Sequence, residues 1–209
     1  MKLELFSKNK IGLLILILSM TISSKAQILN PDELALKKIY TTLEDALKNP
    51  KEVYRLKLVG KPKCDSIPDE IFSLPNLQEL TIRRCKLQLV NNRISELKNL
   101  QYLNLDQNRL VKLPESLCNL SELKTLIISR NYISYLPDNI GKLKKLKAID
   151  AWDNQIYILP KSISKLSETL EVLDLRQVAI KADEYEDMTS LLPKTKIFYT
   201  SFCECKDSR

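Results

Sequence analysis

Histidine is absent from this chain of 209 residues. Catalytic triads that use histidine as the general base are therefore excluded, and so are the usual histidine-containing zinc sites. Glycine is also scarce, with three residues, and no low-complexity tract interrupts the sequence, so no flexible linker is evident. We therefore expect a single domain, in which carboxylates are the one group left for catalysis.

What the sequence has instead is a repeat of 23 residues. A unit this short cannot bury its own apolar side, so copies must stack on one another as a solenoid. Three kinds of residue recur with this period: Leu103, Leu126 and Ile149; Asn108, Asn131 and Asn154; and Pro114, Pro137 and Pro160.

Each unit combines two apolar patterns. Leu103 and Leu105 alternate with polar neighbours, which predicts a short strand with one face inward. After Pro114, apolar residues recur every third position, which suits a short helix or 3₁₀ segment on the opposite side. We expect the recurring asparagine to satisfy buried backbone groups where each coil bends, so we assign it no ligand role.

One full unit reads LQYLNLDQNRLVKLP followed by ESLCNLSEL, and the next two begin LKTLIISRNYISYLP and LKAIDAWDNQIYILP. This series resembles the leucine-rich repeat family, in its class with LPxxIxxLxxLxxLxLxxNxLxxL, of the exported bacterial type. The resemblance extends over residues 53 to 200. It implies an α/β solenoid, a horseshoe with a parallel concave sheet and short helical or 3₁₀ segments on its convex side. We place the repeats at residues 53–180.

Caps are expected at both ends of the repeats, because a solenoid needs polar ends to stay soluble. At residues 27–52, Asn30, Pro31 and Glu33 form a helix-start signature, after which Leu34, Ile39, Leu43 and Leu47 can cover the first coil. At residues 181–209, a cap and tail, we expect a helix over 182–192 and a strand over 196–199.

Residues 1–26 have the pattern of a signal peptide. Three lysines precede an apolar run from Ile11 to Met20, and Ser24 and Ala26 supply the small residues of a cleavage site before Gln27. The run is short for a membrane span, so we expect a secreted or periplasmic protein without stable membrane insertion after cleavage. An uncleaved anchor is the alternative. Cleavage would lower the net charge from +7 to +4, which does not argue for nucleic acid.

The five cysteines leave several pairings open. Cys64 and Cys85 occupy inward positions of adjacent coils, so a bridge is conceivable, although buried thiols are favoured. Cys118 is expected on the convex side. Cys203 and Cys205 form a CxC pair too far along the solenoid to reach the first two, and a metal site there would need further ligands.

Asp150 and Asp174 are the carboxylates best placed for chemistry, because they occupy the same strand position in adjacent repeats. Their backbones should lie about 4.8 Å apart with both side chains on the open face, and Asp153 is nearby. Such a set could act as acid and base or hold Ca²⁺. An open concave strip does not desolvate a carboxylate, however, so we expect neither catalysis nor a metal site.

The concave face is then the candidate functional surface. Trp152, the only tryptophan, points outward in this register and follows Ala151, a small residue at a core position. One interpretation is that Trp152 folds sideways over Ala151; the other is that it is exposed at a binding hot spot. The candidate binding residues occupy outward positions on this face: Arg83, Arg84, Tyr102, Ile127, Arg130, Tyr132, Asp150, Trp152 and Asp153.

The family resemblance implies recognition rather than chemistry. Our hypothesis is a non-enzymatic module without a cofactor that binds a protein partner on the concave face. A carbohydrate or cell-surface glycan binder is the first alternative, with Trp152 and Tyr102 as stacking platforms. The second is a structural or assembly protein that uses its convex face or a sheet edge.

Overall fold

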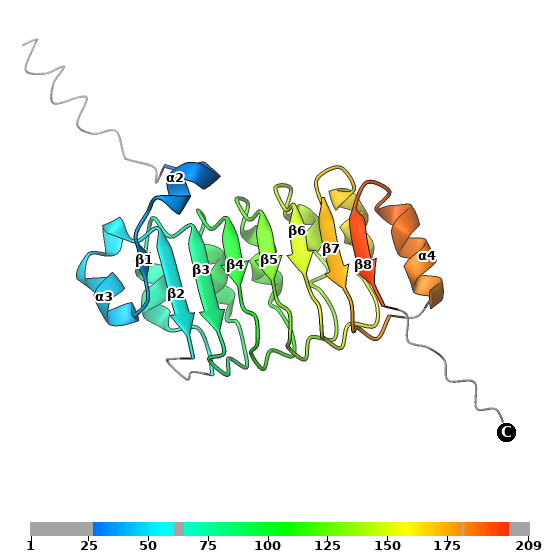
Figure 1. Cartoon of the computed structure of the whole chain (residues 1–209), viewed down its shortest axis with the longest axis horizontal. Helices are drawn as coiled ribbons and strands as arrows, with labels where there is room; N and C mark the ends of the chain where they lie inside the picture. Colours follow the sequence, from blue (N-terminus) through cyan, green and yellow to red (C-terminus); the bar gives the residue numbers. More distant parts are fainter. Residues whose placement is uncertain (1–26, 61–64, 181, 201–209) are drawn as a thin grey trace, which may run out of the picture.

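The computed structural model describes residues 27–60, 65–180 and 182–200. The predicted signal peptide, Cys64, Cys203 and Cys205 lie outside these residues. The predicted solenoid is confirmed: parallel strands lie side by side in one open sheet, in chain order (Figure 1). The strands are β1 (Ile39–Tyr40), β2 (Arg55–Val59), β3 (Glu79–Arg83), β4 (Tyr102–Asn104), β5 (Thr125–Ile127), β6 (Ala148–Asp150), β7 (Val172–Leu175) and β8 (Lys196–Tyr199).

Short 3₁₀ segments run behind the sheet, one in each coil, as the apolar spacing of three predicts. Proline stands directly before three of them, where its fixed φ suits the entry to a helical turn. The segments are η3 (Asp69–Ser73), η4 (Asn92–Glu96), η5 (Glu115–Asn119), η6 (Ile140–Lys142) and η7 (Lys161–Leu166).

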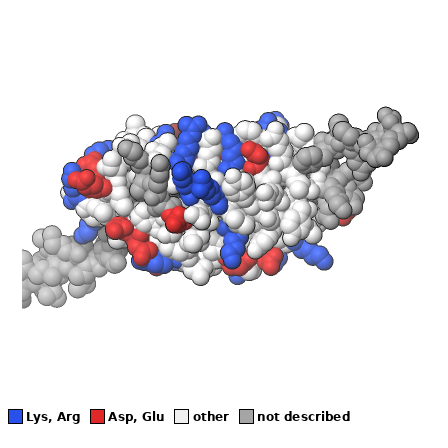
Figure 2. Space-filling view, turned by 90° about the horizontal axis from the view of Figure 1, so that it is seen from below, with Lys and Arg blue, Asp and Glu red and all other residues white. Residues whose placement is uncertain are grey.

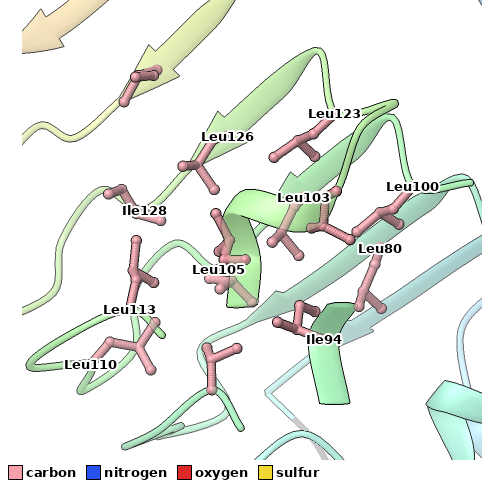
Figure 3. Close-up of a cluster of buried hydrophobic side chains, with 14 of the residues drawn as sticks. Leu80, Ile94, Leu100, Leu103, Leu105, Leu110, Leu113, Leu123, Leu126 and Ile128 are labelled. Carbon is pink, nitrogen blue, oxygen red and sulfur yellow. The ribbon is translucent and has the colours of Figure 1, made fainter. Parts of the chain in front are cut away.

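The sheet register matches the sequence repeat. Leu103 on β4 pairs with Leu126 on β5, which pairs with Ile149 on β6. All three side chains have no exposed surface, and the leucines of successive coils stack between sheet and 3₁₀ segments as one continuous core (Figure 3). Each coil therefore contributes a layer that is buried only because its neighbours cover it.

The recurring asparagines are buried and fully hydrogen-bonded. The amide nitrogen of Asn131 donates to the carbonyl oxygens of Leu105 (3.0 Å), Ile128 (2.9 Å) and Ser129 (3.1 Å), and its side-chain oxygen accepts from the N–H of Leu110 (3.0 Å). Asn108 and Asn154 repeat this pattern in the neighbouring coils. These hydrogen bonds confirm the prediction that the asparagine satisfies buried backbone groups.

The N-terminal cap differs from the expected helix that would cover the first coil. Asn30 caps α2 (Pro31–Ala35) as predicted, through reciprocal hydrogen bonds with Glu33. The chain then forms β1 before α3 (Leu43–Lys48) and η2 (Pro50–Glu52). Ile39 is 40% exposed because it lies on β1 opposite Arg55, and Tyr40 takes the buried position instead. The prediction that Ile39 covers the first coil was therefore wrong.

Two buried glutamines hold the segment that precedes α2. Gln78 accepts from the N–H of Leu29 (3.0 Å) and donates to the carbonyl of Gln27 (2.7 Å), while Gln101 donates to the carbonyl of Leu29 (2.8 Å). Both glutamines are almost fully buried. Their side chains thus satisfy backbone groups of residues 49 to 72 positions upstream. The repeat pattern does not indicate these long-range contacts.

The C-terminal cap agrees with the predicted helix and strand. It consists of α4 (Ala182–Leu191) and β8, which closes the series of strands beside β7 (Figure 1). Met188 and Leu192 are buried against the last coil. Among the described residues, no helix has the length and apolar character needed to cross a membrane.

Removing one layer of the core should destabilise the whole solenoid. We expect Leu126→Ala to lower the free energy of unfolding by about 2 to 5 kcal/mol, through lost burial and a cavity. Asn131→Ala should cost about 1 to 3 kcal/mol, because several buried backbone groups lose their partner. Denaturant unfolding measures both, with the exposed Gln155→Ala as a control that changes stability by less than about 0.5 kcal/mol. Neutral behaviour of either core variant would contradict the register.

Candidate functional site

The predicted site residues lie on the strands of the middle coils, at the bend that follows each strand, or just beyond that bend. Tyr102 is the first outward residue of β4, and Ile127 and Asp150 are paired with one another on β5 and β6. These side chains are partly buried by their neighbours on the sheet. Trp152 follows two residues after Asp150, where the strand has ended and the chain begins to bend.

An ion-pair network fixes two of the predicted arginines. The carboxylate of Asp106 accepts from Nε and Nη2 of Arg130, at 2.8 and 2.7 Å, and from Nε of Arg83 on its other side. The hydroxyl of Ser129 donates to the same carboxylate at 3.1 Å. Asp106 is 3% exposed, so a buried anion between two guanidinium groups is the centre of this surface.

Asp106 was not among the predicted site residues, although its sequence position contains the signal. Arg83 precedes it by one repeat, and Arg130 follows it by one repeat plus one residue. In a parallel sheet of this register, those spacings bring the three side chains together on adjacent coils. Opposite charges one repeat apart on an outward face therefore indicate an ion pair.

Trp152 is only partly exposed, and its ring has a partner within the protein. The guanidinium carbon of Arg130 lies 5.0 Å from the centre of the indole ring, within the range of a cation–π contact. Arg130 thus joins Asp106 to Trp152. Ala151 beneath is fully buried. Of the two interpretations of Trp152, the one that leaves it exposed at a hot spot needs a correction, because the ring is partly covered by Arg130.

Asp150 and Asp174 are paired in register on β6 and β7, as the repeat predicts. Contrary to expectation, the strip does desolvate carboxylates: Asp174 is 9% exposed, and burial raises the pKa of Asp150 above its ordinary value. The carboxylates of Asp174 and Asp106 raise the pKa of Asp150 further, while hydrogen bonds from Ser129 and the N–H of Trp152 oppose the change.

Asp174 itself is neutralised by an arginine two residues later. Nη2 of Arg176 lies 2.5 Å from the Asp174 carboxylate, and Nε donates to both of its oxygens. Among the residues that the structure describes, no group of three or more histidine, cysteine or carboxylate side chains is arranged to hold a metal ion. Burial also raises the pKa of the Tyr102 hydroxyl above its ordinary value.

The remaining predicted residues lie at or beyond the bend after each strand. Arg84, Arg130 and Asp153 occupy equivalent positions with φ of 57°, 54° and 56°, a left-handed conformation unusual for residues other than glycine. Arg84 donates to the side chain of Gln107 at 2.6 Å and is otherwise exposed. Tyr132 is 52% exposed and follows Asn131, so it lies past the bend rather than on the strands.

The cysteines inside the described residues are buried. The thiol of Cys85 donates to the carbonyl of Arg83 at 3.3 Å, at the position that asparagine fills in later coils. Cys118 lies on η5 at the convex side, as predicted, and burial raises the pKa of its thiol to about 12. A thiol with so high a pKa is a poor nucleophile at neutral pH.

A family model described as leucine rich repeat matches the chain twice, over residues 51–110 and 98–156. The chain belongs to the leucine-rich repeat family. Together the two matches span the strands β2 to β6 and the asparagine ladder, which are the parts that carry the ion-pair network. No curated protein has a matching sequence.

Solved structures of leucine-rich repeat proteins share the fold. A leucine-rich repeat protein of Leptospira interrogans is 28% identical over 78% of this chain, with a TM-score of 0.66, and the match spans 47% of that protein. Internalin C2 of Listeria monocytogenes is 24% identical over 78% of this chain and 68% of its own, with a TM-score of 0.62. The chain therefore spans about half the length of the Leptospira protein.

The raised pKa of Asp150 predicts a pH-dependent effect on stability. A carboxyl whose pKa is higher in the folded than in the unfolded state makes folding less favourable as pH rises through that window. Asp150→Asn keeps an acceptor for the N–H of Trp152 but removes the charge, so we expect a higher melting temperature at pH 7. The difference in melting temperature should vanish near pH 3, because the side chain at position 150 then carries almost no charge in either protein. Melting curves of both proteins across this range test it; a variant less stable at pH 7 would contradict it.

Proposed function

We propose that this protein is a non-enzymatic module that binds another protein on its concave face. The leucine-rich repeat fold is generally a protein-interaction module, and its members are typically binding scaffolds. The proposed contact surface has Trp152 and the Arg83–Asp106–Arg130 network at its centre, flanked by Tyr102 and Ile127.

The observation that supports this proposal best is the fixed position of Trp152. Arg130 stacks on its ring and is itself held by a bidentate ion pair with the buried Asp106. An aromatic residue that is already ordered loses little conformational entropy when a partner covers it. Tryptophan and arginine are also the residues in which binding energy most often concentrates.

The same contact weighs against the glycan alternative. A sugar stacks on an open aromatic face, and here the guanidinium of Arg130 covers one face of the Trp152 ring. Tyr102, the second proposed platform, is partly buried by neighbouring side chains. The assembly alternative would use the edge of β8 or the convex side instead, so the experiment below separates the three.

We expect Trp152→Ala to weaken partner binding by about 2 kcal/mol or more, which is roughly thirtyfold in Kd. The melting curve should change little, because the indole lies above the core rather than in it. Photo-cross-linking of the protein to its partner, followed by affinity measurement, gives the comparison. Arg130→Glu would be a less clean test, because it also places a carboxylate beside Asp106.

The control for this experiment is Lys144→Glu, an exposed change on the convex side, where the lysine amine donates to the carbonyl of Lys165. It should alter the salt dependence of binding and little else. Loss of binding in Lys144→Glu with full binding in Trp152→Ala would rule out the concave site. Binding to a glycan array that depends on Trp152 would favour the carbohydrate alternative.

We also propose that the protein is exported to the periplasm or secreted, and that the mature chain begins at Gln27. The support is the lysine-rich start, the apolar run and the small residues before Gln27. N-terminal sequencing of the exported protein should give Gln27 as the first residue. Intact Met1 on membrane-bound material would contradict cleavage and favour the uncleaved anchor.

A further inference from the structure

Large apolar side chains are exposed together on one flank of the solenoid, away from the concave strip. They follow the bend after each strand, in four equivalent segments that begin one residue after the ladder position held by Cys85 or asparagine. We call these segments the flank surface: residues 86–89, 109–112, 132–135 and 155–158. The strands of the repeats end at the lower side of Figure 1, and Figure 2 views the molecule from that side.

The four segments share one burial pattern. The second residue of each points into the core, as Leu110 and Ile133 do with no exposed surface. The other three positions face outward, and parallel bridges such as Tyr135 with Ile158 align neighbouring segments. Outward side chains of successive coils therefore form rows along the flank, spaced by the separation of adjacent strands, about 4.8 Å.

The rows divide into a basic half and an apolar half. Toward the N-terminus they present Lys86, Arg109 and Lys112 alongside the exposed Leu89 and Val111, and none of the three basic residues forms an ion pair among the described residues. Toward the C-terminus the outward residues are mostly aromatic or aliphatic, and no aspartate or glutamate occurs in any of the four segments. Figure 2 shows the corresponding band of lysine and arginine next to a broad area without charge.

The side chains of the apolar half are well exposed. Its members are 44 to 55% exposed: Tyr132, Tyr135, Tyr157 and Ile158. Within the described part of the chain, the hydroxyls of the three tyrosines make no hydrogen bond. Contiguous apolar surface of this kind, with a polar rim, marks an interaction site in soluble proteins, and tyrosine is enriched where proteins meet.

We infer that the flank surface is a second protein-binding site, which takes an acidic polypeptide segment with aromatic or aliphatic side chains next to its acidic residues. The acidic part pairs with Lys86, Arg109 and Lys112, and the apolar part covers the tyrosines. This complementarity fixes the direction in which the segment lies. The four described segments of the flank surface hold three basic residues, fewer than the four to eight that typically attract a protein to an anionic membrane, so a polypeptide fits these segments better.

The inference is independent of the concave site. Trp152 and Arg130 lie before the asparagine of their coils, where Arg130 belongs to the ion-pair network and contacts the Trp152 ring. Tyr135, Tyr157 and Lys112 lie after the asparagine and take no part in that network. Changes to one surface can therefore be made while the other stays intact. If the concave-site proposal fails, peptides should still bind the flank surface. If the flank proposal fails, Trp152→Ala should still weaken binding of the concave-face partner.

A random peptide library displayed on phage, selected against the full-length protein, provides the probe. We expect the enriched sequences to combine aspartate or glutamate with phenylalanine, leucine or tyrosine. Synthetic peptides of these sequences should bind the double variant Tyr135→Ser with Tyr157→Ser at least about tenfold more weakly in fluorescence anisotropy. Lys112→Glu should weaken binding as well, and the loss should shrink at high salt, because the contact is electrostatic.

Two control variants define the surface. Trp152→Ala on the concave face and Lys144→Glu on the convex side should leave peptide binding unchanged. Enriched sequences without acidic residues, or binding that the tyrosine variants do not affect, would overturn the inference. Vesicles of anionic lipid that bind the protein through the same tyrosines while the peptides do not would also overturn it, as would dimers in sedimentation experiments that the tyrosine variants abolish.

Discussion

The asparagine ladder is the interaction on which the rest of this structure depends. Each coil must turn sharply at the end of its strand, and the turn leaves backbone N–H and C=O groups inside the protein. The amide of Asn131 satisfies groups in its own coil and in the coil before it, including the carbonyl of Leu105 and the N–H of Leu110. It thereby bonds neighbouring coils together as well as closing its own turn. Where the ladder stops, at Cys85 on one side and Val178 on the other, a thiol or an apolar side chain takes the place.

The turn that the ladder stabilises also separates the two candidate surfaces. Residues just before the asparagine adopt left-handed backbone conformations, as Arg130 and Asp153 do, and the chain bends there. Side chains before the turn lie on the concave sheet, and those after it lie on the flank. Because every coil turns at the same position, each surface becomes a regular set of rows rather than a scatter of exposed residues. A small unit repeated with different outward residues can thus present two unlike surfaces.

Charge on the concave face is used internally before any partner arrives. Asp106 is nearly buried between Arg83 and Arg130, and Asp174 is paired with Arg176. A buried ion pair adds little stability over apolar residues, but it fixes the geometry of the groups that take part. Here the fixed group is the guanidinium of Arg130, and through it the ring of Trp152. Asp150 forms no ion pair with an arginine among the described residues, and burial raises its pKa.

The sequence by itself determined the repeat, the strand register, the buried leucines and the role of the asparagines, because all of these follow from a period that the chain displays directly. It also indicated the capping box at Asn30 and the strand at Lys196–Tyr199, which depend on local residue preferences. Only the tertiary structure decided that Asp106 joins Arg83 to Arg130, that Trp152 stacks on Arg130, and that Ile39 lies on a strand. These features depend on which side chains of different coils meet and in which rotamers, and on how the end of the stack is closed. A repeat period specifies the position of each residue within its coil, whereas the partners of an outward side chain are specified only when neighbouring coils are packed.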